Sequence, residues 1–177
     1  CDKGNRLVMP YVTSVWTPRA IAAMTPVMST ANLLDPVTAD AGETRFSGLD
    51  HWMQGRTLYG GASALIAYTA VTRAFPDLPP LRAGQVAFVA PTGPQLELRR
   101  EIVRQGRNVA QVRSEIWCEG ECTLTAFFLF GTAREPNAVH PAAPVADWPG
   151  APEDQEPAMK GKGPAFIQNN FEILRAQ

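Results

Sequence analysis

Two different periods of apolar residues run along residues 58–132. From Leu58 to Phe75 the chain is apolar almost all round, and this predicts a helix that other structure encloses. Asp77-Leu-Pro-Pro80 follows and predicts the end of the helix, because proline cannot continue it. Beyond this point apolar and polar residues alternate, as in strands with one buried face.

Four strands are predicted after the helix, over 82–90, 95–104, 108–118 and 121–132. Pro, Gly and the link Glu119-Gly120 separate them, and a two-residue link of this kind is typical of a hairpin. One face of the last two strands is small or apolar, and it is formed by Ala110, Val112, Ser114, Ile116, Cys118, Cys122, Leu124, Ala126, Phe128 and Phe130. A short earlier strand is expected over 44–53, around Phe46 and Trp52. The pattern therefore predicts an α+β domain, with an antiparallel sheet packed on one long helix.

The flanking segments have other patterns. Residues 1–42 contain recurrent prolines and predict a partly irregular N-terminal extension to a domain over 43–135. Residues 136–164 hold seven of the 16 prolines and are typical of a linker. A strand-like piece resumes within 165–177.

Composition narrows the function classes. The chain has 177 residues, of which 45% are hydrophobic and 19% charged, as in a globular domain. A net charge of -1 gives no basic excess for nucleic acid or a membrane surface. Three cysteines cannot build a disulfide framework. No His or third Cys stands at ligand spacing from Cys118 and Cys122, which argues against a zinc site.

Several short runs resemble hot-dog acyl-CoA thioesterases. Phe46-Ser-Gly and Thr57-Leu-Tyr-Gly-Gly-Ala-Ser-Ala-Leu65 are similar to the start of the central helix in that family. Leu81-Arg-Ala-Gly-Gln-Val-Ala-Phe-Val-Ala-Pro91 and Ile102-Val-Arg-Gln-Gly-Arg-Asn108 resemble the following strands of double hot-dog, type II-like enzymes. The resemblance covers 43–135. Pro164-Ala-Phe and Asn170-Phe-Glu-Ile-Leu-Arg175 resemble the first strand of a second hot dog, of which this chain has little more.

This resemblance implies a sheet wrapped around one central helix, pairing with another hot dog as a dimer or with a second domain. It also implies a cytoplasmic protein that hydrolyses an acyl-CoA to a carboxylic acid and coenzyme A. No metal or organic cofactor is expected, since coenzyme A belongs to the substrate.

Gly60 and Gly61 are the first candidates for chemistry. The N–H groups at the start of a helix are unpaired and lie at its positive end, so they suit the oxygen of a thioester that becomes an oxyanion. The alternative is that two glycines only permit a tight turn. In related enzymes of the phenylacetate pathway a His-Gly-Gly is followed by a helical Asp; here Tyr59 and Tyr68 stand at those positions.

The general base is therefore expected elsewhere. Type II-like enzymes carry Asp, Thr and Gln in their second hot dog. Asp50 and His51, just before the helix, are tentative catalytic residues; the alternative is a solvated strand edge. Trp52, Tyr59, Leu65 and Tyr68 are candidates for an acyl pocket, although most apolar helix residues are simply core.

A cluster of arginines on two adjacent strands has two interpretations. Its members are Arg99, Arg100, Arg104, Arg107 and Arg113. Arginine suits the phosphates of coenzyme A, and Arg107 in the Gly-Arg turn is the best candidate. The alternative is an exposed face on which arginines pair with Glu97, Glu101 and Glu115.

Three functions remain open from the residues. The first is an acyl-CoA thioesterase, and the second is a non-catalytic hot-dog module that supplies a dimer half and a pocket wall to an active partner domain. The third is an acyl-CoA hydratase or dehydratase, which needs a His with an Asp or Glu. No such pair is visible on the helix 58–75.

Overall fold

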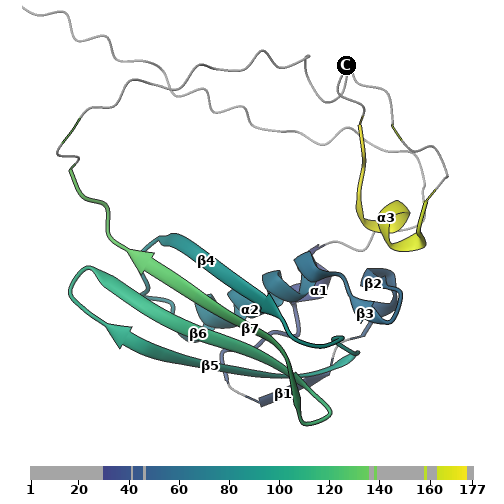
Figure 1. Cartoon of the computed structure of the whole chain (residues 1–177), viewed down its shortest axis with the longest axis horizontal. Coiled ribbons are helices and arrows are strands. Elements are labelled where there is room, and N and C mark those ends of the chain that lie inside the picture. Colours follow the sequence, from purple (N-terminus) through teal and green to yellow (C-terminus); the bar gives the residue numbers. More distant parts are fainter. Residues whose placement is uncertain are drawn as a thin grey trace, which may run out of the picture.

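The computed structural model describes residues 30–40, 42–45, 47–135, 138, 158 and 163–174. Its main body is one sheet with one long helix against it (Figure 1). In chain order the elements are α1 Thr30–Leu34, β1 Gly42–Arg45, the 3-10 helix η1 Leu49–Trp52, β2 Met53–Gln54, β3 Thr57–Leu58, α2 Gly60–Ala74, β4 Leu81–Phe88, β5 Gln95–Gln105, β6 Val109–Cys118, β7 Glu121–Gly131 and α3 Ala165–Asn170.

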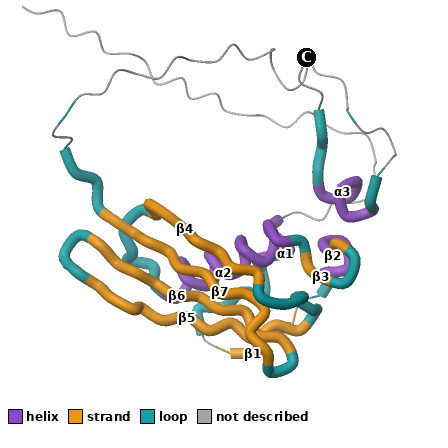
Figure 2. Tube along the Cα trace, viewed as in Figure 1, coloured by secondary structure: helices purple, strands orange, loops and turns teal. Residues whose placement is uncertain are grey.

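The sheet has five antiparallel strands in the order β1-β5-β6-β7-β4 (Figure 2). The four strands predicted after the helix are present, with bounds that differ by at most two residues from the expectation. β4 and β1 are the two edges. β2 and β3 form a separate small hairpin that leads into α2.

The inner face of the sheet packs on α2 as the alternating pattern predicts. Side chains such as Val112, Ile116 and Phe130 are at most 1% exposed, and from the helix Ile66 is fully buried against them. The hydroxyl of Ser114 donates a hydrogen bond of 3.0 Å to the Ala67 carbonyl, which satisfies the one polar side chain of β6 on this face. The predicted arrangement of one helix on an antiparallel sheet is confirmed.

The expected strand over 44–53 is wrong for its second half. Only Gly42–Arg45 pairs with β5, and Leu49–Trp52 forms a 3-10 helix instead. Gly48 precedes it with a φ of 78°, a left-handed conformation that glycine adopts without strain. Trp52 is buried at 5% exposure, so tertiary burial rather than strand pairing fixes this segment.

One residue on the predicted inner face of the last strand lies elsewhere. Ile116 faces Leu124, but Trp117 faces Cys122, so β7 holds an extra residue at Thr123. A one-residue bulge moves the following side chains to the other face of the sheet. Cys122 therefore lies with Trp117 on the outer face, and the expectation that it shares the inner face with Leu124 is wrong.

The buried core reaches further toward the N-terminus than the start expected at residue 43. Leu33 and Val37 belong to the buried core, and Arg73 of α2 donates hydrogen bonds to the Leu34 and Val37 carbonyls. The core thus includes α1, which lies before residue 43; residues 1–29 fall outside the described part.

At the C-terminal end, 165–170 form the helix α3 rather than a strand; after it Phe171 is extended and Leu174 forms a single bridge. The linker expected over 136–164 lies almost wholly outside the described residues. Assignment of the C-terminal segment to a second hot dog stays a prediction.

Candidate active site

The start of α2 offers accessible backbone donors at Gly60 and Gly61. The first intrahelical hydrogen bond at this end runs from Ser63 N–H to the Tyr59 carbonyl, at 3.0 Å. Within the described part of the chain, the Gly60 and Gly61 N–H groups have no acceptor, and Tyr59 makes no side-chain cap. Gly61 is exposed and Gly60 half-buried. An electron-rich oxygen therefore has access to donors at the positive end of a 15-residue helix.

Two aromatic rings occupy the space that side chains at these glycines would need. A Cβ on Gly60 would lie 3.1 Å from Cζ of Phe88, and a Cβ on Gly61 would lie 2.5 Å from Cε1 of Tyr59. Neither glycine has a left-handed φ, so backbone conformation does not require them. The glycines therefore matter here for space rather than for a turn, because the missing side chains give room to two rings that flank the donors.

The C-terminal segment covers one of these rings. Phe166 and Phe171 lie 5.6 and 5.4 Å from the Tyr59 ring, measured between centroids, and Phe171 also contacts Trp52 at 6.2 Å. Phe166 is only 7% exposed. Figure 1 shows α3, in yellow, beside the small β2–β3 hairpin. Trp52 and Tyr59 are therefore packed under this segment.

The candidate catalytic residues Asp50 and His51 lie where η1 meets the C-terminal segment. His51 is exposed, and its Nδ1 is 3.4 Å from Asn169 Nδ2, while its carbonyl accepts a hydrogen bond from Asn170. Asp50 is exposed; its carbonyl accepts a hydrogen bond from the Met53 N–H, but its carboxylate has no hydrogen bond or ion pair within the described residues. Both residues sit in the 3-10 helix η1 and not at the end of a strand. The structure gives His51 a partner in α3 and brings Asp50 to none.

We expect Phe166→Ala to release the C-terminal segment from the domain. The buried Phe166 ring is the main apolar contact of α3, so its loss should raise amide hydrogen exchange of residues 163–174 at least about tenfold, and exchange within α2 should change little. Hydrogen exchange followed by mass spectrometry measures both regions. Ile173→Ala is the matched control, because Ile173 is 38% exposed. Equal effects of the two variants would contradict this packing.

The other two pocket candidates lie further along α2. Tyr68 stands eight residues after Gly60, which is about 12 Å along a helix. Its ring packs on Phe128 at 5.5 Å and on Phe130 at 6.5 Å, on the inner face of the sheet. Leu65 is half-buried. Within this chain, Tyr68 thus packs in the core and does not line the surface around Gly60.

Arg107 lies at the far end of the sheet from the two glycines. It is exposed in the turn between β5 and β6, where it lines a cavity of about 350 Å³ with Arg104 and Arg134. Phe88 marks the other end, opposite Leu124. Leu124 pairs with Ile116, which lies seven residues along β6 from Val109 beside the turn, so the two ends are about 23 Å apart. A role of Arg107 in phosphate binding stays a prediction.

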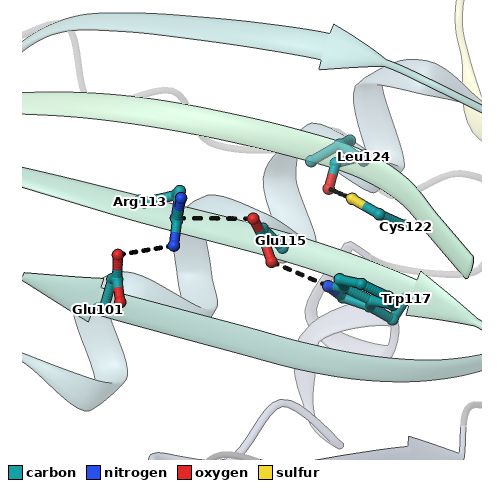
Figure 3. A network of polar contacts seen from close by, with 6 residues as sticks. All are labelled: Glu101, Arg113, Glu115, Trp117, Cys122 and Leu124. Atoms are coloured by element: carbon teal, nitrogen blue, oxygen red, sulfur yellow. Dashed lines mark hydrogen bonds and ion pairs between the residues drawn. The ribbon is translucent and has the colours of Figure 1, made fainter. Parts of the chain in front are cut away.

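The remaining strand arginines mostly pair with glutamates, as one interpretation of the sequence expected. Arg113 contacts Glu101 at 2.8 Å and Glu115 at 3.6 Å, and Glu115 accepts a hydrogen bond from Trp117 Nε1 (Figure 3). Arg99 pairs with Glu97 at 2.5 Å and stacks over the Trp117 ring at 4.0 Å. The outer face is therefore a mutually neutralised surface rather than a free anion site.

Arg100 differs because it lies on the inner side of the sheet. It donates a hydrogen bond of 3.3 Å to the Thr38 carbonyl. Desolvation lowers its pKa, against an opposing effect of Asp40. Its position ties the segment after α1 to the sheet.

The two described cysteines, Cys118 and Cys122, supply no nucleophile at this site. Cys118 is buried and 3.7 Å from the Thr123 hydroxyl, and Cys122 donates to the Leu124 carbonyl at 3.4 Å. Desolvation first, and then Glu115, raise the pKa of the Cys122 thiol, so it stays protonated at neutral pH. Among the described residues, no group of three or more His, Cys, Asp or Glu is placed to hold a metal ion.

The sequence pattern missed three aromatic residues around the donors: Phe88, Phe166 and Phe171. Phe88 looked like an ordinary strand residue, and the strand expected over the C-terminal piece hid the turn of helix that brings Phe166 back onto Tyr59. The signal that was available is Gly60 itself, since a glycine at a helix start leaves room for a neighbouring ring.

Comparison with known proteins shows which family this domain resembles. Residues 49–131 match the family model of the acyl-CoA thioesterase N-terminal domain. No curated protein matches the chain significantly in sequence. The described helices include none long and apolar enough to cross a membrane.

Solved structures share the fold. A hot-dog protein of unknown function from Alicyclobacillus acidocaldarius superposes with a TM-score of 0.62 at 20% identity, over 76% of this chain and 52% of the other. A putative thioesterase II from Thermobifida fusca gives 0.55 at 18%, over 71% and 48%. An acyl-CoA thioesterase II from Mycobacterium marinum gives 0.55 at 18%, over 73% and 48%. The chain spans about half the length of these structures, and the predicted hot-dog fold is confirmed.

Proposed function

Because residues 49–131 form a domain of the hot-dog acyl-CoA thioesterase superfamily, we propose that this chain takes part in the hydrolysis of an acyl-CoA to a carboxylic acid and coenzyme A. The observation that carries the proposal is the accessible pair of unpaired N–H groups at Gly60 and Gly61. These donors hold the thioester carbonyl oxygen and stabilise the negative charge that develops on it when water attacks. Neither a metal nor an organic cofactor takes part, and the protein acts in the cytoplasm, as the family resemblance implies.

The chemical step needs a base that α2 does not carry. The oxygen of water bonds to the carbonyl carbon, the carbon–sulfur bond breaks, and the sulfur leaves as a thiolate that takes up a proton. A group must remove the proton from the attacking water. The helix has no carboxylate, and Tyr59 and Tyr68 stand where related enzymes have His and Asp. We therefore propose that the base comes from a second subunit or domain, with Asp50 and His51 as the tentative alternatives on this chain.

We propose that this second hot dog pairs with the edge strand β4. Within the part of the chain that the structure describes, β4 pairs only with β7, and seven of its eight residues are exposed. An unpaired edge strand presents a row of N–H and C=O groups with which a strand of a neighbour can pair. Phe88, the last residue of β4, contacts Gly60, so a hot dog that joins this edge comes close to the two donors. Phe127, 47% exposed on β7, is a further apolar contact for a neighbour.

We expect Gln85→Lys to weaken this pairing about tenfold or more. When two copies of an antiparallel edge strand pair about a twofold axis, residues near the middle of the strand face their own copies, and two lysines there repel. Gln85 lies in the middle of β4 and is exposed. Light scattering or sedimentation across a concentration series measures the dimer constant. Gln111→Lys on the central strand β6 is the matched control. A stable monomer of the unsubstituted protein at micromolar concentration would contradict the pairing.

The alternative function is a non-catalytic hot-dog module that forms the dimer half and pocket wall of an active partner domain. The missing helix carboxylate supports it for this chain alone. Release of free thiol from acyl-CoA, measured on the protein expressed from its complete reading frame, tests the proposal. Turnover that Gly61→Val abolishes supports the thioesterase. Turnover that is unchanged in Gly61→Val supports the non-catalytic module.

A further inference from the structure

Phe88 combines two properties that rarely occur together. It faces the inner side of the sheet, directly opposite Leu124, which is fully buried. Its own side chain is nevertheless 60% exposed. The reason is its place at the end of the edge strand β4, where nothing in the described chain covers it. A large apolar ring is thereby left open beside the start of α2.

The ring of Phe88 is one of two walls beside the free donors. It lies over Gly60, while the ring of Tyr59 lies over Gly61. Tyr59 is fixed by two aromatic contacts, with Phe166 and Phe171. Phe88 has no aromatic contact among the described residues. The Tyr59 ring is therefore held in place by packing, whereas the Phe88 ring is free to contact a ligand bound at the donors.

Resting on the proposed thioester binding at Gly60 and Gly61, we infer that Phe88 determines which acyl groups the site accepts. The carbonyl carbon of a thioester carries two substituents, the sulfur and the acyl chain, and in this pose the acyl chain lies against the ring that packs on Gly60. A straight or planar acyl group lies flat along an aromatic ring. A branch on the carbon next to the carbonyl requires the ring to move. The site thus takes straight-chain or planar acyl thioesters and rejects those branched next to the carbonyl.

The size of this selectivity follows from the fit of one methyl group. A misfit of one methyl group in an apolar site changes kcat/KM by about 10- to 100-fold. We therefore expect butanoyl-CoA to be hydrolysed at least about tenfold better than 2-methylpropanoyl-CoA. Phe88→Ala should reduce this ratio to near one, mainly by raising kcat/KM for the branched thioester. Phe88→Leu, which keeps an apolar side chain on the edge, should give an intermediate ratio.

A second pair of variants tests the steric contact itself. Gly60→Ala places a methyl group 3.1 Å from Phe88 and should push the ring away, so the preference for the straight thioester should be lost. The double variant Gly60→Ala/Phe88→Leu should recover much of that loss, because the shorter side chain gives way. Phe127→Ala removes a ring that is 47% exposed on the outer face and should leave the ratio unchanged. Loss of recovery in the double variant would overturn the proposed contact.

The outcomes separate this inference from the proposed function. If the complete protein hydrolyses no acyl-CoA, hydrolysis is refuted, and the thioether analogues of the two thioesters test Phe88 by calorimetry. Tighter binding of the straight analogue, lost in Phe88→Ala, supports the inference. If hydrolysis occurs and the ratio is the same in Phe88→Ala while dimer affinity falls, Phe88 is an interface residue and the inference is overturned. Equal or absent binding of the two analogues overturns it as well.

Discussion

Gly61→Val is expected to lower acyl-CoA hydrolysis by about 100-fold or more, the effect of losing one oxyanion donor. The reason lies in the contact of Gly61 with its neighbour. An added Cβ would lie 2.5 Å from the Tyr59 ring, a distance that side chains do not tolerate. Tyr59 cannot simply move aside, because Phe166 and Phe171 pack on it. The first turn of α2 must shift, or the ring must swing over the donors, and the carbonyl oxygen loses its position in both cases.

The control for this variant is Gly93→Ala. A Cβ on Gly93 meets no atom within 4 Å, and its φ is not left-handed, so this substitution should leave turnover and stability nearly unchanged. Thiol release measures turnover, and circular dichroism verifies folding. Full turnover in a folded Gly61→Val protein would remove the oxyanion role. Asp50→Ala should keep its turnover, and a large loss there would show that the base lies on this chain.

The regular part of the fold was predictable because its signals are local. Alternation along β6 and the turn residues Glu119-Gly120 depend only on neighbouring positions, so strand bounds came out within two residues. The left-handed φ of both turn residues, 51° and 84°, agrees with the hairpin signal. The apolar run of α2 carried the same kind of information.

The parts that sequence reasoning missed depend on distant contacts. Residues 165–170 are apolar and polar in an order that suits a strand, yet they form α3, in which Asn170 donates to the Phe166 carbonyl and to His51. His51 precedes Asn170 by more than a hundred positions. Trp52 is likewise held in η1 under Phe171. No local pattern encodes such partners.

The candidate site shows the same division. The free donors at Gly60 and Gly61 follow from the start of a helix, which the sequence marks clearly. The rings that surround them come from β4 and α3, and only the fold brings these elements together. Arg107 shows the reverse, since a plausible residue type lies at the other end of the sheet from the donors.

The core under α2 yields the largest expected change in stability. Phe130 is 1% exposed and packs on Tyr68 and Phe128, so Phe130→Ala leaves a cavity between the helix and the sheet. We expect a loss of about 3–5 kcal/mol in the free energy of unfolding, measured by urea denaturation. Phe127→Ala is the matched control, because that residue lies on the same strand at 47% exposure and should cost about 1 kcal/mol or less in dilute protein.

Equal losses in the two variants would mean that the outer face is as well packed as the inner one. A loss for Phe127→Ala that grows with protein concentration would assign that packing to a second copy of the chain, because only association depends on concentration.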